Sequence, residues 1–181
     1  PNLLVLRPAD ANETAEAWRV ALKHRTGPVA LVLTRQKLSL VDRTTHGAAS
    51  GVAKGAYVLK DAVGGKPKAV IIATGSEVEI ALKAQSELLK LDVPTRVVSM
   101  LSMEVFGAQD AAYQTSVLPT GVKRVAIEAA HPMSWHRWVA DGAIVGIETF
   151  GASAPLKELQ RKYGFEPDQV AAAAKKQVGR E

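Results

Sequence analysis

The amino-acid sequence predicts an α/β protein: a three-layer α/β/α domain with a mostly parallel five-stranded sheet, preceded by the last βαβ piece of a truncated α/β domain. Short apolar runs rich in Val and Ile, such as residues 69–73, are typical of strands buried on both faces. They alternate with segments of helical periodicity, such as residues 76–91. A buried strand, a helix and a second buried strand form a βαβ unit whose strands run parallel.

The composition is that of a soluble globular protein. The chain has 181 residues, of which 47% are hydrophobic and 23% charged. No apolar run approaches the roughly 18 residues that a membrane helix needs, and no signal peptide is recognisable. The sequence has no cysteine, which excludes disulfides, thiolate chemistry and Cys-based metal sites. We therefore expect a cytoplasmic protein that does not interact with membranes.

The formal charge of +5 does not indicate nucleic-acid binding. The basic residues are dispersed, and only three Phe, three Tyr and three Trp are available for stacking on bases. A mild excess of positive charge suits small anionic substrates equally well. We expect no nucleic-acid partner.

Residues 1–36 predict one βαβ unit. Residues 3–6 and 29–33 are expected to be buried strands, and Asp10 is expected to cap the helix between them, with Glu13 in the matching third position. Two strands and one helix cannot bury both faces of a parallel sheet. The sequence is therefore expected to be a fragment that begins inside a domain. The packed face of the helix is predicted to carry Trp18, Ala21 and Leu22.

A polar, glycine-rich stretch at residues 37–55 predicts a linker to a second domain, residues 56–181. That domain is expected to begin with a short edge strand at residues 57–59. A helix is predicted to start at Ser76, with Glu79 completing a capping box. Its apolar face is predicted to carry Val78, Ala81, Leu82, Leu88 and Leu89.

The rest of the second domain continues the alternation of strands and helices. A strand at residues 95–100 follows the first helix, and Gly107 is expected to break the helical segment 102–118. Ser134 is expected to cap a short helix at residues 133–139. The remaining predicted elements are strands 123–127 and 143–147 and helices 156–163 and 167–178.

Ligands of open parallel sheets bind at the carboxyl ends of the strands, which directs attention to three acidic or polar residues. Ser76 lies at a helix N-terminus, which suits an anion, although the residue can also serve as an ordinary helix cap. Glu128 and Glu148 each follow a strand and could form an acid–base pair, or could be solvated acids at the sheet edge.

Histidine and arginine side chains offer two further kinds of candidate. His131 and His136 are five positions apart with Pro132 between them, a spacing that disfavours two metal ligands on one helix face. Arg35 follows the strand at 29–33, where a guanidinium could bind a phosphate or carboxylate, or remain a solvated surface residue. No nucleotide-binding, protease or hydrolase motif is present. The residues by themselves identify no reaction.

Several segments, taken together, resemble the C-terminal third of bacterial transketolases: LRPADANETAEAW, GPVALVLTRQKL, IIATGSEVEIAL and GIETFGASAPLKELQRKYGF. The resemblance covers nearly the whole chain in the right order. It implies that residues 1–36 end a pyrimidine-binding domain and that residues 56–181 form the transketolase C-terminal domain. It further implies a homodimeric transferase of the pentose phosphate pathway that uses thiamine diphosphate and Mg²⁺ to move a two-carbon ketol unit from a ketose phosphate to an aldose phosphate.

The resemblance places one known functional residue in this chain. The arginine of LTRQ is Arg35. The resemblance implies that this arginine binds the phosphate of the sugar. The catalytic residues and those that bind cofactor and metal lie upstream of residue 1 in the family, so this polypeptide alone is expected to bind neither and to be inactive. Ser76, Glu128 and Glu148 remain a candidate anion or regulatory site.

Two other interpretations stay open. The chain could belong to another thiamine-dependent enzyme, such as a deoxyxylulose-phosphate synthase or a ketoacid dehydrogenase subunit, although these are not expected to carry LTRQ and FGASAP together. It could also be a free-standing α/β binding or dimerisation module without catalysis. The incomplete first domain argues against the module, because it would leave strand edges exposed.

Overall fold

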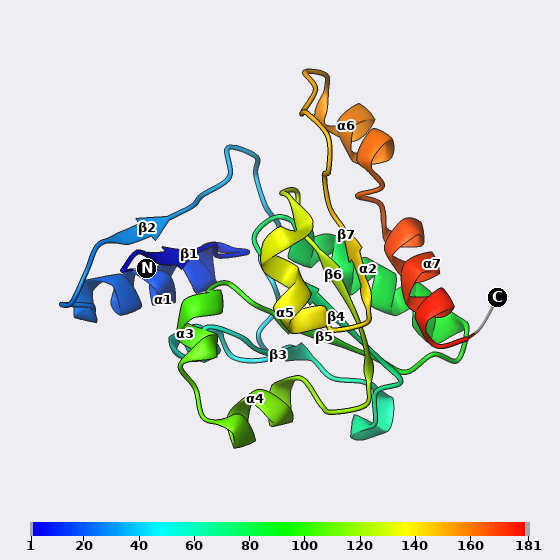
Figure 1. The fold of residues 1–181 in the computed structure, drawn as a ribbon, viewed down its shortest axis with the longest axis horizontal. Coiled ribbons are helices and arrows are strands. Elements are labelled where there is room, and N and C mark those ends of the chain that lie inside the picture. Colours follow the sequence, from blue (N-terminus) through cyan, green and yellow to red (C-terminus); the bar gives the residue numbers. More distant parts are fainter. Residues whose placement is uncertain (1, 180–181) are drawn as a thin grey trace.

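Two sheets organise the chain in the computed structural model, which describes residues 2–179 (Figure 1). Residues 1, 180 and 181, at the outer ends of the two predicted domains, lie outside the described residues. The first sheet is a parallel pair with Leu4 opposite Val29, which confirms the predicted βαβ unit. Its elements are β1 (Leu4–Leu6), α1 (Ala11–Lys23) and β2 (Val29–Leu31).

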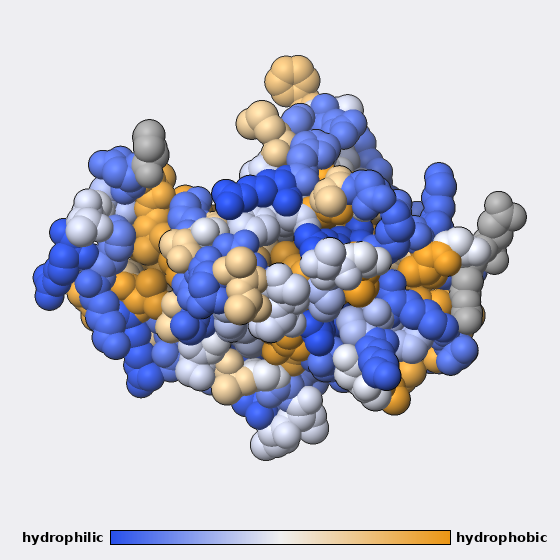
Figure 2. Space-filling model, turned by 60° about the horizontal axis from the view of Figure 1, so that its bottom comes forward, coloured by the Kyte–Doolittle hydropathy of each residue, from blue (hydrophilic) through white to orange (hydrophobic). Residues whose placement is uncertain are grey.

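The first sheet is less buried than the sequence predicts. The expectation of a buried strand over residues 29–33 is wrong, because β2 ends at Leu31 and its residues are only half-buried. Val32 and Leu33 are 45% and 55% exposed. Figure 2 shows apolar side chains gathered at this end of the molecule, over β1, α1 and β2. One helix is too little to cover both faces of the pair.

The packed face of α1 also differs from the prediction. The fully buried Ala17 belongs to the same apolar cluster as Val52, which lies in a 3₁₀ turn at residues 49–54 that packs against α1. Trp18 and Leu22, predicted for the packed face, are instead 52% and 67% exposed. Ala21 is partly buried against the core. Helical spacing identified an apolar stripe, but the neighbour of α1 lies on an adjacent side.

Residues 41–55 lie against both sheets. The backbone N–H of Gly47 donates to the carbonyl of Leu59 at 2.7 Å, and the Arg43 guanidinium donates to the Tyr57 hydroxyl at 2.8 Å. The second half of the predicted linker is thus held by hydrogen bonds to the larger sheet. The predicted domain boundaries at residues 36 and 55 stay predictions.

The second sheet has five strands in the order β3-β5-β4-β6-β7. All neighbouring strands run parallel except β3, which pairs antiparallel with β5 at one edge. This confirms the predicted mostly parallel sheet and the short edge strand. The strands are β3 (Tyr57–Lys60), β4 (Ala69–Ala73), β5 (Thr95–Ser99), β6 (Lys123–Ile127) and β7 (Ala143–Val145).

Helices cover both faces of this sheet, as predicted (Figure 1). Because side chains alternate along a strand, Ile71 packs in the cluster that contains α2 and α7, whereas Val70 and Ile72 pack in the cluster that contains α3, α4 and α5. None of the helices in residues 2–179 is both long and apolar enough to cross a membrane. The helices are α2 (Glu77–Lys90), α3 (Met103–Gly107), α4 (Ala111–Val117), α5 (His136–Val139), α6 (Leu156–Tyr163) and α7 (Pro167–Gln177).

Two predicted helix caps are wrong. Ser76 has helical dihedral angles and its hydroxyl donates to the Glu77 carboxylate at 2.6 Å, so it caps no backbone N–H. Glu79 pairs with Lys83 instead of completing a capping box. The short helix expected from residue 133 begins with a 3₁₀ turn, Pro132–Trp135, and the side chain that accepts from its first turn is that of His131, not Ser134.

Candidate functional site

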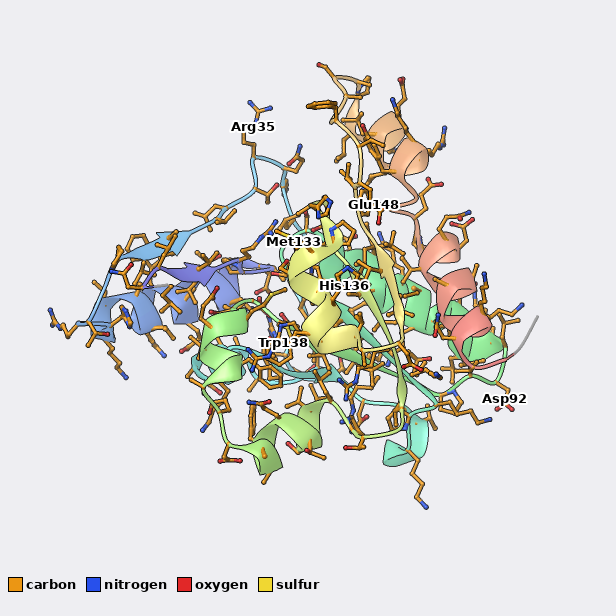
Figure 3. The ribbon with its side chains drawn as sticks, in the orientation of Figure 1. Arg35, Asp92, Met133, His136, Trp138 and Glu148 are labelled. Atoms are coloured by element: carbon orange, nitrogen blue, oxygen red, sulfur yellow. The ribbon has the colours of Figure 1, made fainter. Side chains whose placement is uncertain are left out.

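Arg35 lies at the tip of the loop that follows β2. Figure 3 shows its side chain pointing away from the body of the molecule. The residue is exposed, and no hydrogen bond or ion pair joins its side chain to any other residue in the range 2–179. The adjacent backbone is shaped locally, since the N–H of Gln36 donates to the Thr34 hydroxyl at 3.2 Å. The guanidinium is therefore free to bind an external anion with both arms of its fork.

A cleft of about 410 Å³ lies between residues 36–38, in the loop that follows β2, and the helices α2 and α6. Ser76 and Lys83 of the α2 region lie on one side and residues 36–38 on another. Leu156 and Tyr163 of α6 contribute an apolar wall. Ser76 thus lines this cavity, and its hydroxyl is engaged with Glu77.

The other two residues of the predicted anion or regulatory site lie elsewhere. Glu128 is 3% exposed, accepts from the Trp135 indole N–H and forms an ion pair with Arg7, lining a separate cavity of about 180 Å³. Glu148 is exposed beyond the end of β7 and lines neither cavity (Figure 3). The three residues do not line one common cavity. A shared role for them stays a prediction.

Arg7, which is not among the predicted site residues, lies where the two sheets meet. Its carbonyl accepts from the N–H of Gly75 and the hydroxyl of Thr74, both at 3.1 Å, and its own N–H donates to the Leu101 carbonyl at 2.8 Å. Burial lowers the pKa of the Arg7 guanidinium, partly offset by the negative charge of Glu77. The segment after β1 thus occupies the carboxyl edge of β4, the place where open α/β sheets bind ligands.

A buried polar network forms a second junction between the sheets. The carboxylate of Glu13, fully buried, accepts from the Tyr57 hydroxyl at 2.6 Å and the Ser99 hydroxyl at 2.7 Å. The Tyr57 hydroxyl accepts from Arg43, whose other arm donates to Asp10 at 2.9 Å. Burial raises the pKa of Tyr57, and the neighbouring Glu13 charge raises it further. The sequence showed only a helix cap at Asp10 and Glu13.

The histidines lie apart from these groups. His131 accepts from the N–H of Met133 at 3.2 Å, and His136 begins α5 on the outer surface (Figure 3). Within residues 2–179, no three side chains of His, Asp or Glu come close enough together to hold a metal ion.

Comparison with known proteins identifies two matching family models. The model described as transketolase-like C-terminal domain matches residues 55–166, and the model of the transketolase pyrimidine-binding domain matches residues 1–40. The transketolase of Aquifex aeolicus is 49% identical over 173 residues, covering 94% of this chain and 25% of that protein. That of Geobacillus stearothermophilus is 48% identical over 182 residues, covering 99% and 27%. The chain spans about a quarter of the length of these curated relatives.

Solved structures show the same fold. Transketolase from Leishmania mexicana superimposes with a TM-score of 0.90 at 37% identity, covering 99% of this chain and 26% of that one. A Pichia stipitis transketolase in complex with sedoheptulose 7-phosphate gives 0.89 at 34% identity, covering 99% and 25%. The transketolase of Campylobacter jejuni gives 0.84 at 36% identity, covering 94% and 26%.

Proposed function

The chain belongs to the transketolase family, and from this premise we propose that it is the C-terminal part of a transketolase, an enzyme that transfers a two-carbon ketol unit from a ketose phosphate to an aldose phosphate. The match of residues 1–40 to a pyrimidine-binding domain and of residues 55–166 to a C-terminal domain supports this order of parts. The names of the relatives favour it over other thiamine-dependent enzymes and over a module without catalysis.

The observation that carries the proposal is the unpaired guanidinium of Arg35. It lies in the segment matched to the pyrimidine-binding domain and is presented to solvent without a protein partner among residues 2–179. A planar guanidinium binds phosphate oxygens with two parallel hydrogen bonds. We assign Arg35 to binding the phosphate of the sugar substrate, the class of ligand to which the sedoheptulose 7-phosphate of the Pichia stipitis complex belongs.

Thiamine diphosphate with Mg²⁺ is part of the proposal, because when bound it acts as an electron sink for the carbanion formed on ketol transfer. Among residues 2–179 no three His, Asp or Glu side chains form a cluster, so we propose that the ligands of the metal–diphosphate group come from other parts of the enzyme. No step at the cofactor is therefore assigned to this chain. The proposed enzyme is a cytoplasmic homodimer of the pentose phosphate pathway, in which these residues contribute Arg35 and the C-terminal domain.

The domain organisation belongs to the same proposal. Residues 1–36 end the pyrimidine-binding domain, residues 37–55 connect it, and residues 56–181 form the C-terminal domain. In the latter, Ser76, Glu128 and Glu148 keep their proposed role as ligand or regulatory residues, each at its own position. Of these three residues, Ser76 is the one that we propose a small anion could reach, through the cavity that Ser76 lines.

The proposal is tested by substituting Arg35 in the intact enzyme that contains this segment. Arg35→Ala is expected to raise KM for a ketose phosphate about 10- to 100-fold, the equivalent of one lost charged hydrogen-bond pair. Arg35→Lys is expected to have a smaller effect, because lysine keeps the charge but loses the fork. With the same ketose lacking its phosphate, KM should not change.

Arg25→Ala serves as the matched control, because Arg25 is also an exposed arginine but precedes β2 instead of following it. It is expected to leave KM for both donors unchanged. If Arg35→Ala affects the phosphorylated and the unphosphorylated donor equally, the assignment of Arg35 to phosphate binding is wrong.

A second test concerns the chain alone. The 181-residue polypeptide, incubated with thiamine diphosphate, Mg²⁺ and a ketose phosphate donor, is expected to show no ketol transfer in a coupled assay, whereas the full-length enzyme is active. Binding of thiamine diphosphate to the isolated polypeptide, measured by calorimetry, is also expected to be absent. Turnover above the background of a heat-treated sample would contradict the proposal.

A further inference from the structure

The position of Arg35 depends on how its loop is held. We define the Arg35 loop as residues 32–40. At its start, the N–H of Val32 donates to the Leu6 carbonyl at 2.9 Å and so continues the pairing of β1 with β2. Beyond that bond, within the part of the chain that the structure describes, no hydrogen bond ties residues 33–40 to anything outside the loop. The end of the loop must therefore be fixed elsewhere.

Asp10 holds the end of the loop. The N–H of Val41, the first residue after the loop, donates to one Asp10 carboxylate oxygen at 3.0 Å. Two residues further on, Arg43 donates to the other oxygen at 2.9 Å. That second oxygen also accepts the N–H of Glu13 at 2.8 Å, which caps α1. One carboxylate, itself only 5% exposed, thus joins the helix between β1 and β2 to the chain that leaves the loop.

Further hydrogen bonds connect Asp10 and Arg43 to the larger sheet. Arg43 donates to the Gly47 carbonyl at 3.0 Å and to Tyr57, the first residue of β3. Tyr57 in turn donates to Glu13, which also accepts from Ser99 at the end of β5. Because Glu13, Tyr57 and Ser99 are buried, their hydrogen bonds are stronger than at the surface and hold their partners in a fixed arrangement.

We propose that Asp10 is a positioning residue for phosphate binding: by holding the end of the Arg35 loop against α1, it sets where the Arg35 guanidinium lies. The inference rests on the proposed role of Arg35. Asp10 itself is buried, and both of its carboxylate oxygens accept hydrogen bonds from protein groups, so it would act on the substrate only through the loop. A loop released at Val41 would still carry Arg35, but in many conformations, and ordering it would then oppose substrate binding.

The substitution Asp10→Ser separates loop anchoring from helix capping. Serine keeps an oxygen that can accept the N–H of Glu13, so the cap of α1 is preserved. It loses the second oxygen, which holds Val41, and the charge that holds Arg43. In the intact enzyme, we expect KM for a ketose phosphate to rise about tenfold with kcat little changed, because a displaced binding group weakens the ground state and transition state together. KM for the unphosphorylated ketose should stay unchanged.

A double-mutant cycle shows whether Asp10 acts through Arg35. If it does, Asp10→Ser combined with Arg35→Ala is expected to be no worse than Arg35→Ala alone, since there is no guanidinium left to position. Additive losses, or equal losses with both donors, would overturn the inference and leave Asp10 with a structural role. The control is Asp110→Ser, which alters the aspartate that caps α4 by accepting from Tyr113, and which should change neither KM.

A second variant covers the case in which Asp10→Ser does not fold, as judged by its urea unfolding transition. Arg43→Lys keeps the positive charge but cannot contact Asp10, Tyr57 and Gly47 at the same time. It is expected to raise KM selectively for the phosphorylated donor, and an unchanged KM overturns the inference. If Arg35→Ala itself has no effect, the proposed function fails. If Arg35→Ala acts and Asp10→Ser does not, only the positioning role fails.

Discussion

Glu128 is a buried carboxylate whose negative charge is balanced by Arg7, a residue near the N-terminal end of the chain. Replacing Arg7 by methionine keeps most of the apolar volume but leaves that charge without its partner. Glu128 is buried and the Arg7 side chain is 30% exposed, so breaking the pair costs up to about 3 kcal/mol, the lower end for a fully buried pair, because the remaining charge stays largely out of water. We therefore expect Arg7→Met to lower the free energy of unfolding by that amount, measured by urea denaturation.

The control for Arg7→Met is an ion pair at the surface. Lys83 and Glu79 lie on one face of α2 with 2.6 Å between nitrogen and oxygen, and the Lys83 side chain is 61% exposed. Such pairs contribute roughly 0.3–0.5 kcal/mol. Lys83→Met should accordingly change the unfolding transition little, and equal losses for the two variants would contradict a special role for the buried pair.

Asp61 is expected to make the free energy of unfolding depend on pH in the acidic range. Burial raises the pKa of this carboxyl, but hydrogen bonds from Arg96 at 2.8 and 2.9 Å and from the N–H of Ala62 outweigh burial and lower its pKa. A depressed pKa contributes stability above the unfolded value, near pH 4, and this stability is lost as the pH falls through the folded value. Asp61→Asn should therefore reduce the pH dependence of unfolding below about pH 4.

The comparison for Asp61→Asn is Gln169→Asn, which changes an exposed amide that carries no titratable proton. It should leave the slope of unfolding free energy against pH close to that of the parent chain. Identical slopes for Asp61→Asn and the parent would show that the pair with Arg96 does not couple folding to protonation.

For individual residues, the sequence predicted hydrogen-bond partners that are close along the chain and missed those that are distant. The cap of α1 by Asp10 is confirmed, since the Glu13 N–H donates to its carboxylate. The side chain of Glu13, expected to turn back to the Asp10 backbone, instead accepts from Ala9, Tyr57 and Ser99. The last two lie 44 and 86 residues away along the chain. A three-residue spacing carries no information about such partners.

Among the secondary elements, the turn at the end of the 3₁₀ segment 49–54 has little room for a side chain. Gly55 has φ of +81°, and a Cβ there would lie 2.3 Å from the N of Phe106 and 2.6 Å from the carbonyl oxygen of Ser102. Both atoms belong to the backbone around α3 and cannot move aside independently. Gly55→Ala should therefore destabilise the chain by several times the roughly 1 kcal/mol that a left-handed conformation alone costs a non-glycine residue.

Gly64 provides the matched control for Gly55. Its φ is +73°, but a Cβ there would meet nothing within 4 Å. Gly64→Ala should cost only about 1 kcal/mol, because the backbone conformation alone is unfavourable. Thermal unfolding of the two variants measures the difference, and similar melting temperatures would mean that α3 moves to accommodate the new methyl group.

Prediction of the elements succeeded where burial is symmetric. β4 and β5 are buried at every position. An unbroken apolar run identified β4, and the β-branched residues that follow Pro94 identified β5 within a residue of its end. The prediction failed where the exposure or conformation of a residue depends on neighbouring parts of the structure. The exposure of Val32 and Leu33 depends on what lies over β2, and the turn before α2 is set by Gly75 at φ +56°, which leaves Ser76 already helical.

In limited proteolysis of the whole molecule, we expect trypsin to cut first in the Arg35 loop. Arg35 and Lys37 lie in an exposed segment whose backbone makes no long-range hydrogen bond among the described residues between Val32 and Val41. Proteases need such segments. Brief treatment with trypsin should give two pieces that separate on a denaturing gel but elute together in size exclusion, because the ion pair of Arg7 with Glu128 and the Glu13 network still join them.

The prediction is wrong if trypsin cuts the chain elsewhere at an earlier time than at residues 35–37. Separation of the two pieces under native conditions would contradict the view that the two sheets form one packed unit. A protease-resistant variant provides the control. Arg35→Gln combined with Lys37→Gln removes both tryptic sites without touching the network, and should slow the first cut markedly.

The long reach of the Glu13 network also affects the order of events during protein synthesis. Glu13 leaves the ribosome before its partners do, and its acceptor role is complete only when Ser99, 86 residues later, has emerged. Arg7 must wait longer still, for Glu128. Contacts between such distant residues form late because the intervening chain must first be ordered. The βαβ unit that contains Arg7 and Glu13 therefore settles only after residues well beyond it have emerged, and until then its apolar surface is open to chaperones.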